Sequence, residues 1–451
     1  MSFANAGFGH EAGPPNLVFI MADDLGYGDL GCYGQARIKT PHIDRLAAEG
    51  MKFTQFYAGS TVCAPSRCVL MTGYHTGHCF IRGNGKDNLR PDDITVAEVL
   101  RPAGYKSGLI GKWGLGHEGS LGVPTKQGFD FFFGYLDQHH AHNYYPAFLL
   151  RNETRVPLRN VVPGDGKWGR GVASKKVDYS QDLIADETDS FVRAHADEPF
   201  FLYLALTLPH ANNQARQEGM EIPSYGEYEK TDWPEPQKGH AAMITRMDSD
   251  VGKLVALLEE LGIGDNTLVI FTSDNGPHRE GGNDPDFQDS NGPLNGIKRS
   301  LHEGGIRVPL IARCPNLIEP GTVSDHVGYF CDIMPTFAEL AGSSAQCPDN
   351  IDGLSFAPTL TGDHDKQKKH DFLYWAFYER GGARAVRFDD WKAIQQPIHT
   401  PVRLYNLAKD LGEETDVAAE HIDITQAASQ LMDAQYTPSD RWQVPTKKKK
   451  K

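Results

Sequence analysis

The residues of this sequence best suited to covalent chemistry lie in one short stretch, Cys63-Ala64-Pro65-Ser66-Arg67, which Thr72-Gly73 follows. Pro65 fixes its own φ and disfavours the helical region at the residue before it, so we expect Cys63 on an extended or turn backbone. The apolar run 68–71 can start a helix just behind the thiol, and the N-terminus of that helix would lower the pKa of Cys63. The alternative is a buried structural cysteine at a turn.

Carboxylates follow two apolar segments that are typical of buried strands. Residues 16–22 lead into Asp23 and Asp24, and residues 267–272 lead to Asp274 and Asn275. Ligands of open α/β sheets bind at the carboxyl ends of strands. Adjacent like charges need a compensating cation or donors, and carboxylate and amide oxygens suit Ca²⁺ or, less well, Mg²⁺. The alternative is a pair of exposed turns with aspartate caps.

Basic side chains occur in three further loops. Lys112 follows the predicted strand 105–110, His210 follows the predicted strand 199–206, and Lys298 precedes a Glu-Gly-Gly sequence. For Lys112 and His210 the alternative is a solvent-exposed residue at a turn. Cationic groups placed where negative charge develops would stabilise a transition state, and an imidazolium at residue 210 could protonate a departing alkoxide.

Residues 129–145 are rich in aromatic side chains and histidines. We interpret this segment as a substrate-facing loop, where flat rings can contact a sugar or an aryl group. A metal cluster is the rival interpretation, but no carboxylate or cysteine pattern nearby supports it. The candidate substrate-binding residues, two of them outside this segment, are His117, His139, His140, His142, Asn143 and His302.

The Cys-x-Pro-Ser-Arg pattern with its Thr-Gly resembles the signature of the type I sulfatases of the alkaline phosphatase superfamily, and the resemblance runs from Asn16 to about Leu411. It implies that a formylglycine-generating enzyme oxidises Cys63 to formylglycine, whose hydrated aldehyde attacks sulfur. It also implies a bound Ca²⁺ and a set of catalytic residues. The implied ligands are Asp23, Asp24, Asp274, Asn275 and an oxygen of modified Cys63. The implied catalytic residues are Cys63, Arg67, Lys112, His210 and Lys298.

One position departs from the family pattern. The family usually has a histidine two residues after the lysine of its Gly-Lys-Trp motif, where it is assigned to the formylglycine hydroxyl, and this chain has Gly114. We hypothesise that His117, or a histidine of the following segment such as His142, replaces it. The departure also prompts the alternative of a non-catalytic protein that binds sulfated glycans. A phosphomonoesterase or phosphonate ester hydrolase on the same scaffold is the alternative among enzymes.

The composition and net charge of the chain limit the classes of partner that it can bind. A chain of 451 residues with a net charge of −14 argues against nucleic acid, and an anionic substrate must be attracted by a local basic pocket. No apolar run has the length of a membrane span. Residues 1–15 lack the basic-then-apolar pattern of a signal peptide, so we expect a cytoplasmic protein if the sequence is complete, and a periplasmic or secreted one if a leader was removed. The seven cysteines show no CxxC spacing and an odd total, which indicates neither a zinc site nor a disulfide framework.

Alternating strand and helix patterns predict an α/β fold with a large, mostly parallel central sheet flanked by helices. The resemblance implies the alkaline phosphatase-like sulfatase fold, with a smaller C-terminal subdomain of antiparallel strands and a helix. The expected division is a tail (1–15), a catalytic domain (16–362), a C-terminal α+β subdomain (363–446) and a basic tail (447–451).

Overall fold

A computed structural model of the chain describes residues 13–164 and 168–444. Most of the predicted tail 1–15 and all of the basic tail 447–451 lie outside the described residues. The described chain forms an 11-stranded sheet, a separate 4-stranded sheet and helices around both. This arrangement confirms the predicted α/β class.

The larger sheet is mostly parallel. Its strands are β1 (Asn16–Ala22), β2 (Met51–Tyr57), β3 (Lys106–Lys112), β4 (Phe131–Tyr135), β5 (Phe148–Arg151), β6 (Thr154–Pro157), β7 (Phe200–Ala205), β8 (Thr267–Ser273), β9 (Arg307–Arg313), β10 (Thr322–Ser324) and β11 (Gly328–Tyr329). They run in the order β10-β2-β9-β8-β1-β7-β3-β4-β5-β6, with β11 also paired to β2. The central run from β8 to β4 is parallel throughout, whereas β9 is antiparallel to both of its neighbours. The carboxyl ends of β8, β1, β7 and β3 therefore share one edge of the sheet.

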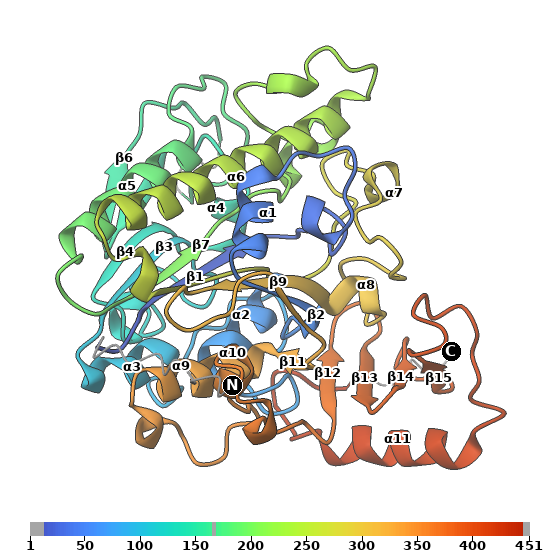
Figure 1. The fold of residues 1–451 in the computed structure, drawn as a ribbon. Helices are drawn as coiled ribbons and strands as arrows, with labels where there is room; N and C mark the ends of the chain where they lie inside the picture. The colour runs from blue at the N-terminus through green and yellow to red at the C-terminus, as the bar shows by residue number, and fades with distance from the viewer. Residues whose placement is uncertain (1–12, 165–167, 445–451) are drawn as a thin grey trace, which may run out of the picture.

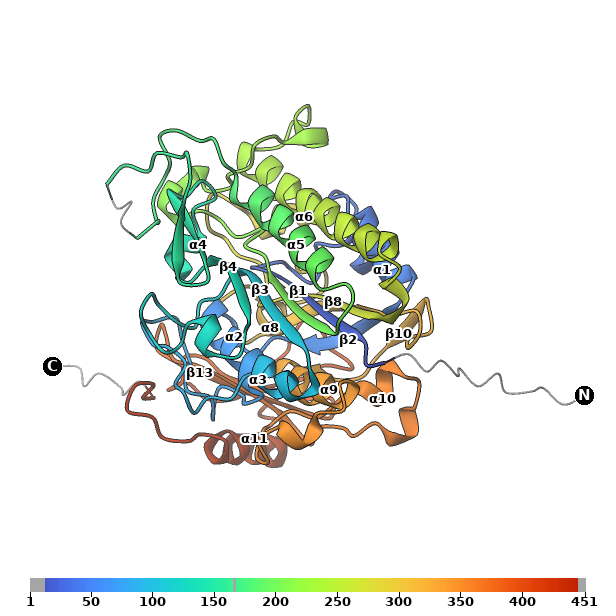
Figure 2. The same cartoon turned by 90° about the vertical axis from the view of Figure 1, so that its left-hand side faces the viewer.

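Helices cover both faces of this sheet (Figures 1 and 2). On one face lie α1 (Pro41–Ala48), α5 (Ser180–Ala194) and α6 (Glu235–Glu260), and on the other lie α2 (Cys63–Thr72), α3 (Val96–Leu100), α9 (Ile333–Leu340) and α10 (Ala357–Leu360). The remaining helices are α4 (Gln138–Ala141), α7 (Pro285–Gln288), α8 (Glu303–Ile306) and α11 (Ile422–Ala434).

Alternate residues of β1 pack against opposite helical layers. Val18 and Ile20 belong to the core that includes Met247 of α6, whereas Phe19 packs edge-on against Phe337 of α9. Because successive side chains of a strand point to opposite faces, a strand covered on both sides must be apolar at every position. This requirement explains the continuous apolar run that predicted β1.

Two predicted boundaries differ in the structure. The amphipathic pattern of residues 241–261 predicts a helix, and in the structure this helix begins earlier, at Glu235. Pro234 and Pro236 are tolerated there because an amide at a helix N-terminus makes no intrahelical hydrogen bond that a proline could remove. The predicted strand 105–110 extends to Lys112, so that this lysine is the last residue of β3.

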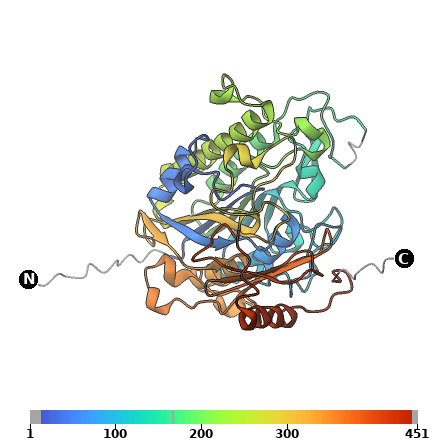
Figure 3. The same cartoon turned by 90° about the vertical axis from the view of Figure 1, so that its right-hand side faces the viewer.

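The smaller sheet is antiparallel, as predicted, in the order β12 (Leu373–Phe377), β13 (Ala383–Phe388), β14 (Trp391–Gln395) and β15 (Arg403–Asn406). The patterns at residues 372–377, 385–388 and 391–393 predict the first three of these strands, and no pattern predicted β15. One face packs on α11 through residues such as Met432, while the other, with Trp375, joins the core of the larger sheet. Figure 3 shows this sheet between α11 and the rest of the molecule.

A buried ionic network connects the two sheets. The Glu303 carboxylate, at the start of α8, accepts a hydrogen bond from Lys392 of β14 at 2.7 Å and one from the Tyr57 hydroxyl of β2 at 2.6 Å. Arg307 donates to the same carboxylate at 3.2 Å. Burial disfavours the charged form of Glu303, but Lys392 and Arg307 outweigh it and lower the pKa of Glu303 from 4.5 to about 2.

Among the described residues, no helix is both long and apolar enough to cross a bilayer.

Candidate active site

The acidic residues predicted from two strand ends meet in the structure. Asp23 and Asp24 follow β1, and Asp274 and Asn275 follow β8, its parallel neighbour. Asp24 donates its backbone N–H to Asp274 Oδ1 at 3.1 Å and accepts the Asn275 side-chain amide at 2.7 Å. Asp24 lies in the left-handed region, with φ of 66°, so the chain turns sharply after β1. All four side chains are buried.

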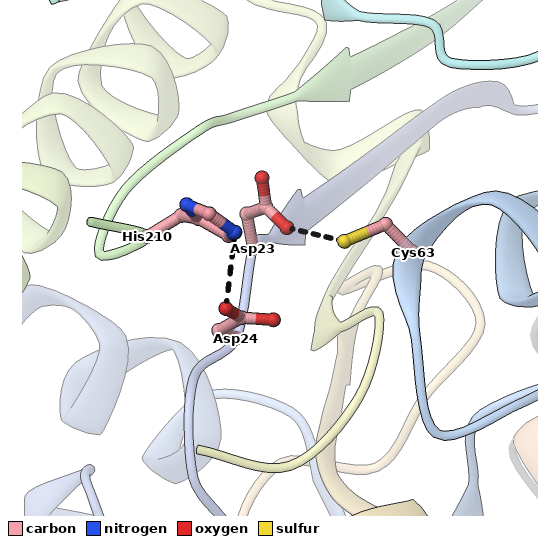
Figure 4. A group of neighbouring side chains, drawn as sticks. All are labelled: Asp23, Asp24, Cys63 and His210. Carbon is pink, nitrogen blue, oxygen red and sulfur yellow. Dashed lines mark hydrogen bonds and ion pairs between the residues drawn. The ribbon is translucent and has the colours of Figure 1, made fainter. Parts of the chain in front are cut away.

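Cys63 reaches this cluster from the first residue of α2 (Figure 4). Its Sγ lies 3.3 Å from Asp23 Oδ1. The prediction of an extended backbone at Cys63 is wrong: the extended residue is Val62, and the helix begins at the cysteine itself. Pro65 is accommodated because an amide in the first turn of a helix has no intrahelical acceptor to lose. The Ala64 amide is satisfied instead by the side chain of Asn84, at 3.0 Å.

Three buried cations pair with the carboxylates. Lys112, at the end of β3, contacts Asp23 Oδ2 at 2.7 Å, and Lys298 contacts Asp24 Oδ2 at 2.6 Å. Arg67, one turn after Cys63, donates to Asp274 Oδ2 at 2.8 Å and to the Lys112 carbonyl at 2.7 Å. The five segments that carry these groups are far apart in sequence and converge at one end of the sheet.

Burial and charge set the protonation of these groups. Burial disfavours ionised Asp23, but the charges of Lys112 and Arg67 outweigh it and hold the pKa of Asp23 well below its usual value. Burial and the charge of Asp23 raise the pKa of Asp274. Burial and Asp23 also raise the pKa of the Cys63 thiol, so the predicted lowering by the helix N-terminus is wrong. The unmodified residue is therefore a protonated thiol, which is a poor nucleophile.

The oxygen-rich cluster is suited to a hard divalent cation. Asn275 Oδ1 is buried and has no hydrogen-bond partner, although its amide nitrogen is bonded. An unsatisfied buried acceptor is costly, and a cation would satisfy it. One potential ligand atom from each of Asp23, Asp24, Cys63 and His210 lies within 4.8 Å of the others. The residues present therefore fit a Ca²⁺ site, and the raised pKa of Asp274 would fall to normal beside such an ion.

His210 has the protonation state of a neutral imidazole. Its Nδ1 contacts the Ala211 carbonyl at 2.7 Å and its Nε2 lies 3.0 Å from Lys298 Nζ. A carbonyl only accepts and an ammonium only donates, so Nδ1 carries the hydrogen and Nε2 the lone pair. Burial and Lys298 hold the pKa of His210 well below its usual value. The ring is therefore neutral in this structure, and the imidazolium that protonates the leaving group stays a prediction.

Two residues of this cluster were not predicted. Glu280 lies 3.4 Å from Lys298 Nζ and 2.6 Å from Arg299 Nη2, and Lys298 and His210 lower its pKa despite burial. His278 stacks on His210, with ring centroids 5.6 Å apart, and accepts the Glu280 amide. Both follow Asp274 within six residues, and that proximity is the only sequence signal for them.

A cavity of about 880 Å³ opens beside Cys63. Of the predicted residues it brings together Cys63, His210, Lys298, His117, His139, His140 and His142. Basic residues and an exposed tryptophan also line it: Lys86, Arg155, Arg170, Arg299 and Trp168. A pocket of this size is typical of sites for small molecules or for part of a chain.

The structure does not bring Asn143 or His302 to this pocket. The Asn143 side chain donates to the Gly169 carbonyl and accepts the Tyr145 amide, both at 3.0 Å. His302 lies 3.2 Å from Glu413, in the contact with the C-terminal sheet. His140 lines the cavity, but its Nε2 contacts the Phe148 carbonyl at 2.9 Å, and burial lowers its pKa to about 4.

Gly114 has a specific structural setting. Its φ of 79° is in the left-handed region, and a Cβ added there would lie 2.3 Å from Gln138 Nε2. Gln138, the first residue of α4, thus occupies the space that a side chain at residue 114 would need. Glycine at residue 114 therefore leaves the space that Gln138 of α4 occupies.

A second cluster consists of His75, His78 and Asp352, which are residue types that can bind a metal. The tautomer of His75, however, does not suit metal binding. The Gly77 amide donates to His75 Nδ1 at 3.0 Å, so the neutral ring carries its hydrogen on Nε2, which faces Asp352 at 3.5 Å. That nitrogen has no lone pair for a metal. The cluster instead connects the segment after α2 to the loop at Asp352.

Comparisons with known proteins agree with this geometry. A family model described as Sulfatase matches residues 15–343, and one described as N-sulphoglucosamine sulphohydrolase, C-terminal, matches residues 297–436. Arylsulfatase A of Homo sapiens is 33% identical over 476 residues, covering 93% of this chain and 87% of that protein. N-acetylgalactosamine-6-sulfatase of Rattus norvegicus is 33% identical over 403 residues, covering 84% of this chain and 71% of that protein. The crystal structure of Ps i-CgsB in complex with k-i-k-neocarrahexaose superimposes with a TM-score of 0.78 at 28% identity, covering 96% and 94% of the two chains.

Proposed function

Since this chain belongs to the sulfatase family, we propose that it hydrolyses a sulfate monoester of a carbohydrate or an aryl alcohol by means of a formylglycine formed from Cys63 and a bound Ca²⁺. The observation that carries the proposal is the convergence of Cys63 with three carboxylates and three buried cations, beside a pocket that Cys63 and Lys298 line.

The charges of this cluster suit an anionic substrate. Three carboxylates, of Asp23, Asp24 and Asp274, face three cationic side chains, of Arg67, Lys112 and Lys298. Because these charges balance, a divalent cation bound among the carboxylates leaves the site positive toward a sulfate group. The attraction is local, since the chain as a whole has a net charge of −14.

The proposed cation, Ca²⁺ in preference to Mg²⁺, would be held by Asp23, Asp24, Asp274, Asn275 and residue 63, and when bound it would polarise a sulfate oxygen. Formylglycine at residue 63, made by a formylglycine-generating enzyme, would supply the nucleophilic hydroxyl that a protonated thiol lacks. Lys112 and Lys298 would neutralise charge on the sulfate oxygens, and Arg67, which donates to Asp274, would hold that ligand beside them.

The wall of the pocket suggests the kind of alcohol. Trp168 is about half exposed at its rim, and the histidines of α4 and His117 line its side. Flat rings of this kind stack on the apolar faces of sugars and on aryl groups. Asn143 and His302 have other partners, so we propose that they only support the surrounding loops.

The test joins the mass of the peptide that contains Cys63 with an assay of sulfate release from nitrophenyl sulfate and from sulfated sugars. We expect formylglycine at residue 63 in protein from a host with the maturation enzyme, and turnover that is lost in Cys63→Ala. An oxidised residue 63 with faster turnover of phosphate or phosphonate esters would replace the proposal by an esterase of that class. Binding of sulfated glycan with no turnover of any ester would indicate the binding protein instead.

A further inference from the structure

We propose that His142 is a catalytic residue of the sulfate ester hydrolysis proposed above, on which this inference rests: a ring N–H of its neutral imidazole donates a hydrogen bond to the ester oxygen of the leaving group. That oxygen gains negative charge as its bond to sulfur breaks, and a donor aimed at it stabilises the transition state.

His142 has a polar atom without a partner. It is 8% exposed and lines the cavity together with Cys63 and Lys298, yet its Nδ1 is buried and makes no hydrogen bond. Buried polar atoms without partners are costly and uncommon in proteins. The other ring nitrogen, Nε2, is not enclosed and has no hydrogen-bond partner among the described residues either, so a substrate in the cavity can accept a hydrogen bond from it in the tautomer whose lone pair is on Nδ1.

The other imidazole near Cys63 is not available. Both ring nitrogens of His210 are engaged, one by the Ala211 carbonyl and the other by Lys298. His142 stacks face to face on His210, with ring centroids 4.4 Å apart and an angle of 15° between the planes. His210 therefore acts as a positioning residue that fixes Lys298 on one side and the ring of His142 on the other.

The order of burial places His142 on the leaving-group side of the sulfate. His210, which contacts Asp24, is 1% exposed, His142 behind it is 8% exposed, and His139 on the same helix is mostly exposed. The rings thus follow a path from the carboxylates toward solvent. With the sulfate bound among the cations, as the proposed function has it, the ester oxygen and the alcohol would point along this path.

Helix α4 brings His142 to this place. Asp137 caps α4 by accepting the amide of His139, and His142 follows the last residue of the helix. Gln138, at the start of the helix, fills the space beside Gly114.

The experiment compares His142→Ala with wild type on two esters, nitrophenyl sulfate and an alkyl sulfate of a sugar. Nitrophenolate leaves without help, whereas a sugar alkoxide needs a donor. We expect kcat/KM for the sugar sulfate to fall by about 10²–10³, and that for nitrophenyl sulfate to fall much less. His142→Asn, which keeps an N–H donor, should recover part of the loss.

His240→Ala is the matched control. His240 on α6 is also a buried imidazole without hydrogen-bond partners, but it does not line the pocket, so its truncation should leave the ratio of the two kcat/KM values unchanged. His117→Ala tests the rival donor, because His117 Nε2 is also buried without a partner. A second readout needs no turnover: in a crystal of Cys63→Ala with a sulfated sugar, a ring nitrogen of His142 should lie about 3 Å from the ester oxygen.

Each outcome decides between the two proposals. Equal losses on both esters in His142→Ala, or a selective loss in His117→Ala alone, would overturn the role of His142 and leave the sulfatase proposal intact. A bound ester whose oxygen faces another side chain would do the same. Wild-type protein with formylglycine at residue 63 that releases no sulfate from any ester would overturn both.

Discussion

Replacing Lys392 by methionine should destabilise the protein at neutral pH. The change removes the cation nearest to the buried Glu303, whose carboxylate then keeps only Arg307 and the Tyr57 hydroxyl. The lowering of the Glu303 pKa from 4.5 to about 2 corresponds to about 3 kcal/mol of stabilisation at neutral pH. Removing one partner of a buried ion pair typically costs about 3–5 kcal/mol.

The measurement is the melting temperature. A chain of this size has an unfolding entropy near 0.9 kcal/mol per degree, so a loss of about 3–5 kcal/mol lowers the melting temperature by about 3–6 °C. Because folding depresses the pKa of Glu303, its contribution is fully present above the unfolded value of 4.5 and is lost as the pH falls toward 2. The difference between wild type and Lys392→Met should therefore shrink between pH 7 and pH 3.

The control is Lys366→Met, which changes an exposed lysine of the C-terminal region and should melt with wild type. If Lys392→Met melts at the wild-type temperature at pH 7, or if the difference is the same at pH 3, the charge of Glu303 does not stabilise the contact between the two sheets. The reasoning from burial and pKa would then fail.

Three other changes test the site and its surroundings. Lys298→Ala should lower kcat/KM for a sulfate ester by about 10²–10³, measured by sulfate release, because it removes a buried cation from the sulfate. A chelator should lower the melting temperature and Ca²⁺ should restore it, and Asn275→Ala should weaken Ca²⁺ binding in calorimetry, since its Oδ1 has no other partner. Gly114→Ala should cost at least about 1 kcal/mol in urea unfolding, because φ is 79° and the new Cβ meets Gln138. Adding Gln138→Ala to Gly114→Ala should recover the part of the lost stability that comes from the contact between the new Cβ and Gln138. If the losses of the two single variants simply add in the double variant, that contact does not cause the loss.

The acidic cluster and the position of Lys112 could be predicted from the sequence for a physical reason. An uninterrupted apolar run marks a strand buried on both faces, and parallel strands place their carboxyl ends at one edge. Asp23 and Asp274 therefore had to lie at the same edge, even though a single sequence does not reveal that β1 lies between β8 and β7. Lys112 is close to them for the same reason.

The remaining features depend on contacts that no local pattern records. Pro65 biases the residue before it against helix, yet the helix begins two residues earlier because its first amides need no intrahelical partner. The neutral ring of His210 depends on Lys298, which is 88 residues away in the chain. Glu280, His278 and Gln138 lie in loops or at a helix start, where residue type alone does not distinguish a site from a surface.

The burial of Cys63 also limits when this residue could be oxidised. The side chain is 3% exposed and lies between β1, α2 and the loop that carries Asn84. If residue 63 becomes formylglycine, as proposed above, the oxidising enzyme must reach a thiol that the finished fold encloses. Under that proposal oxidation competes with folding, and a molecule that folds first keeps its thiol. The active fraction of a preparation would then depend on the relative rates of oxidation and folding during synthesis.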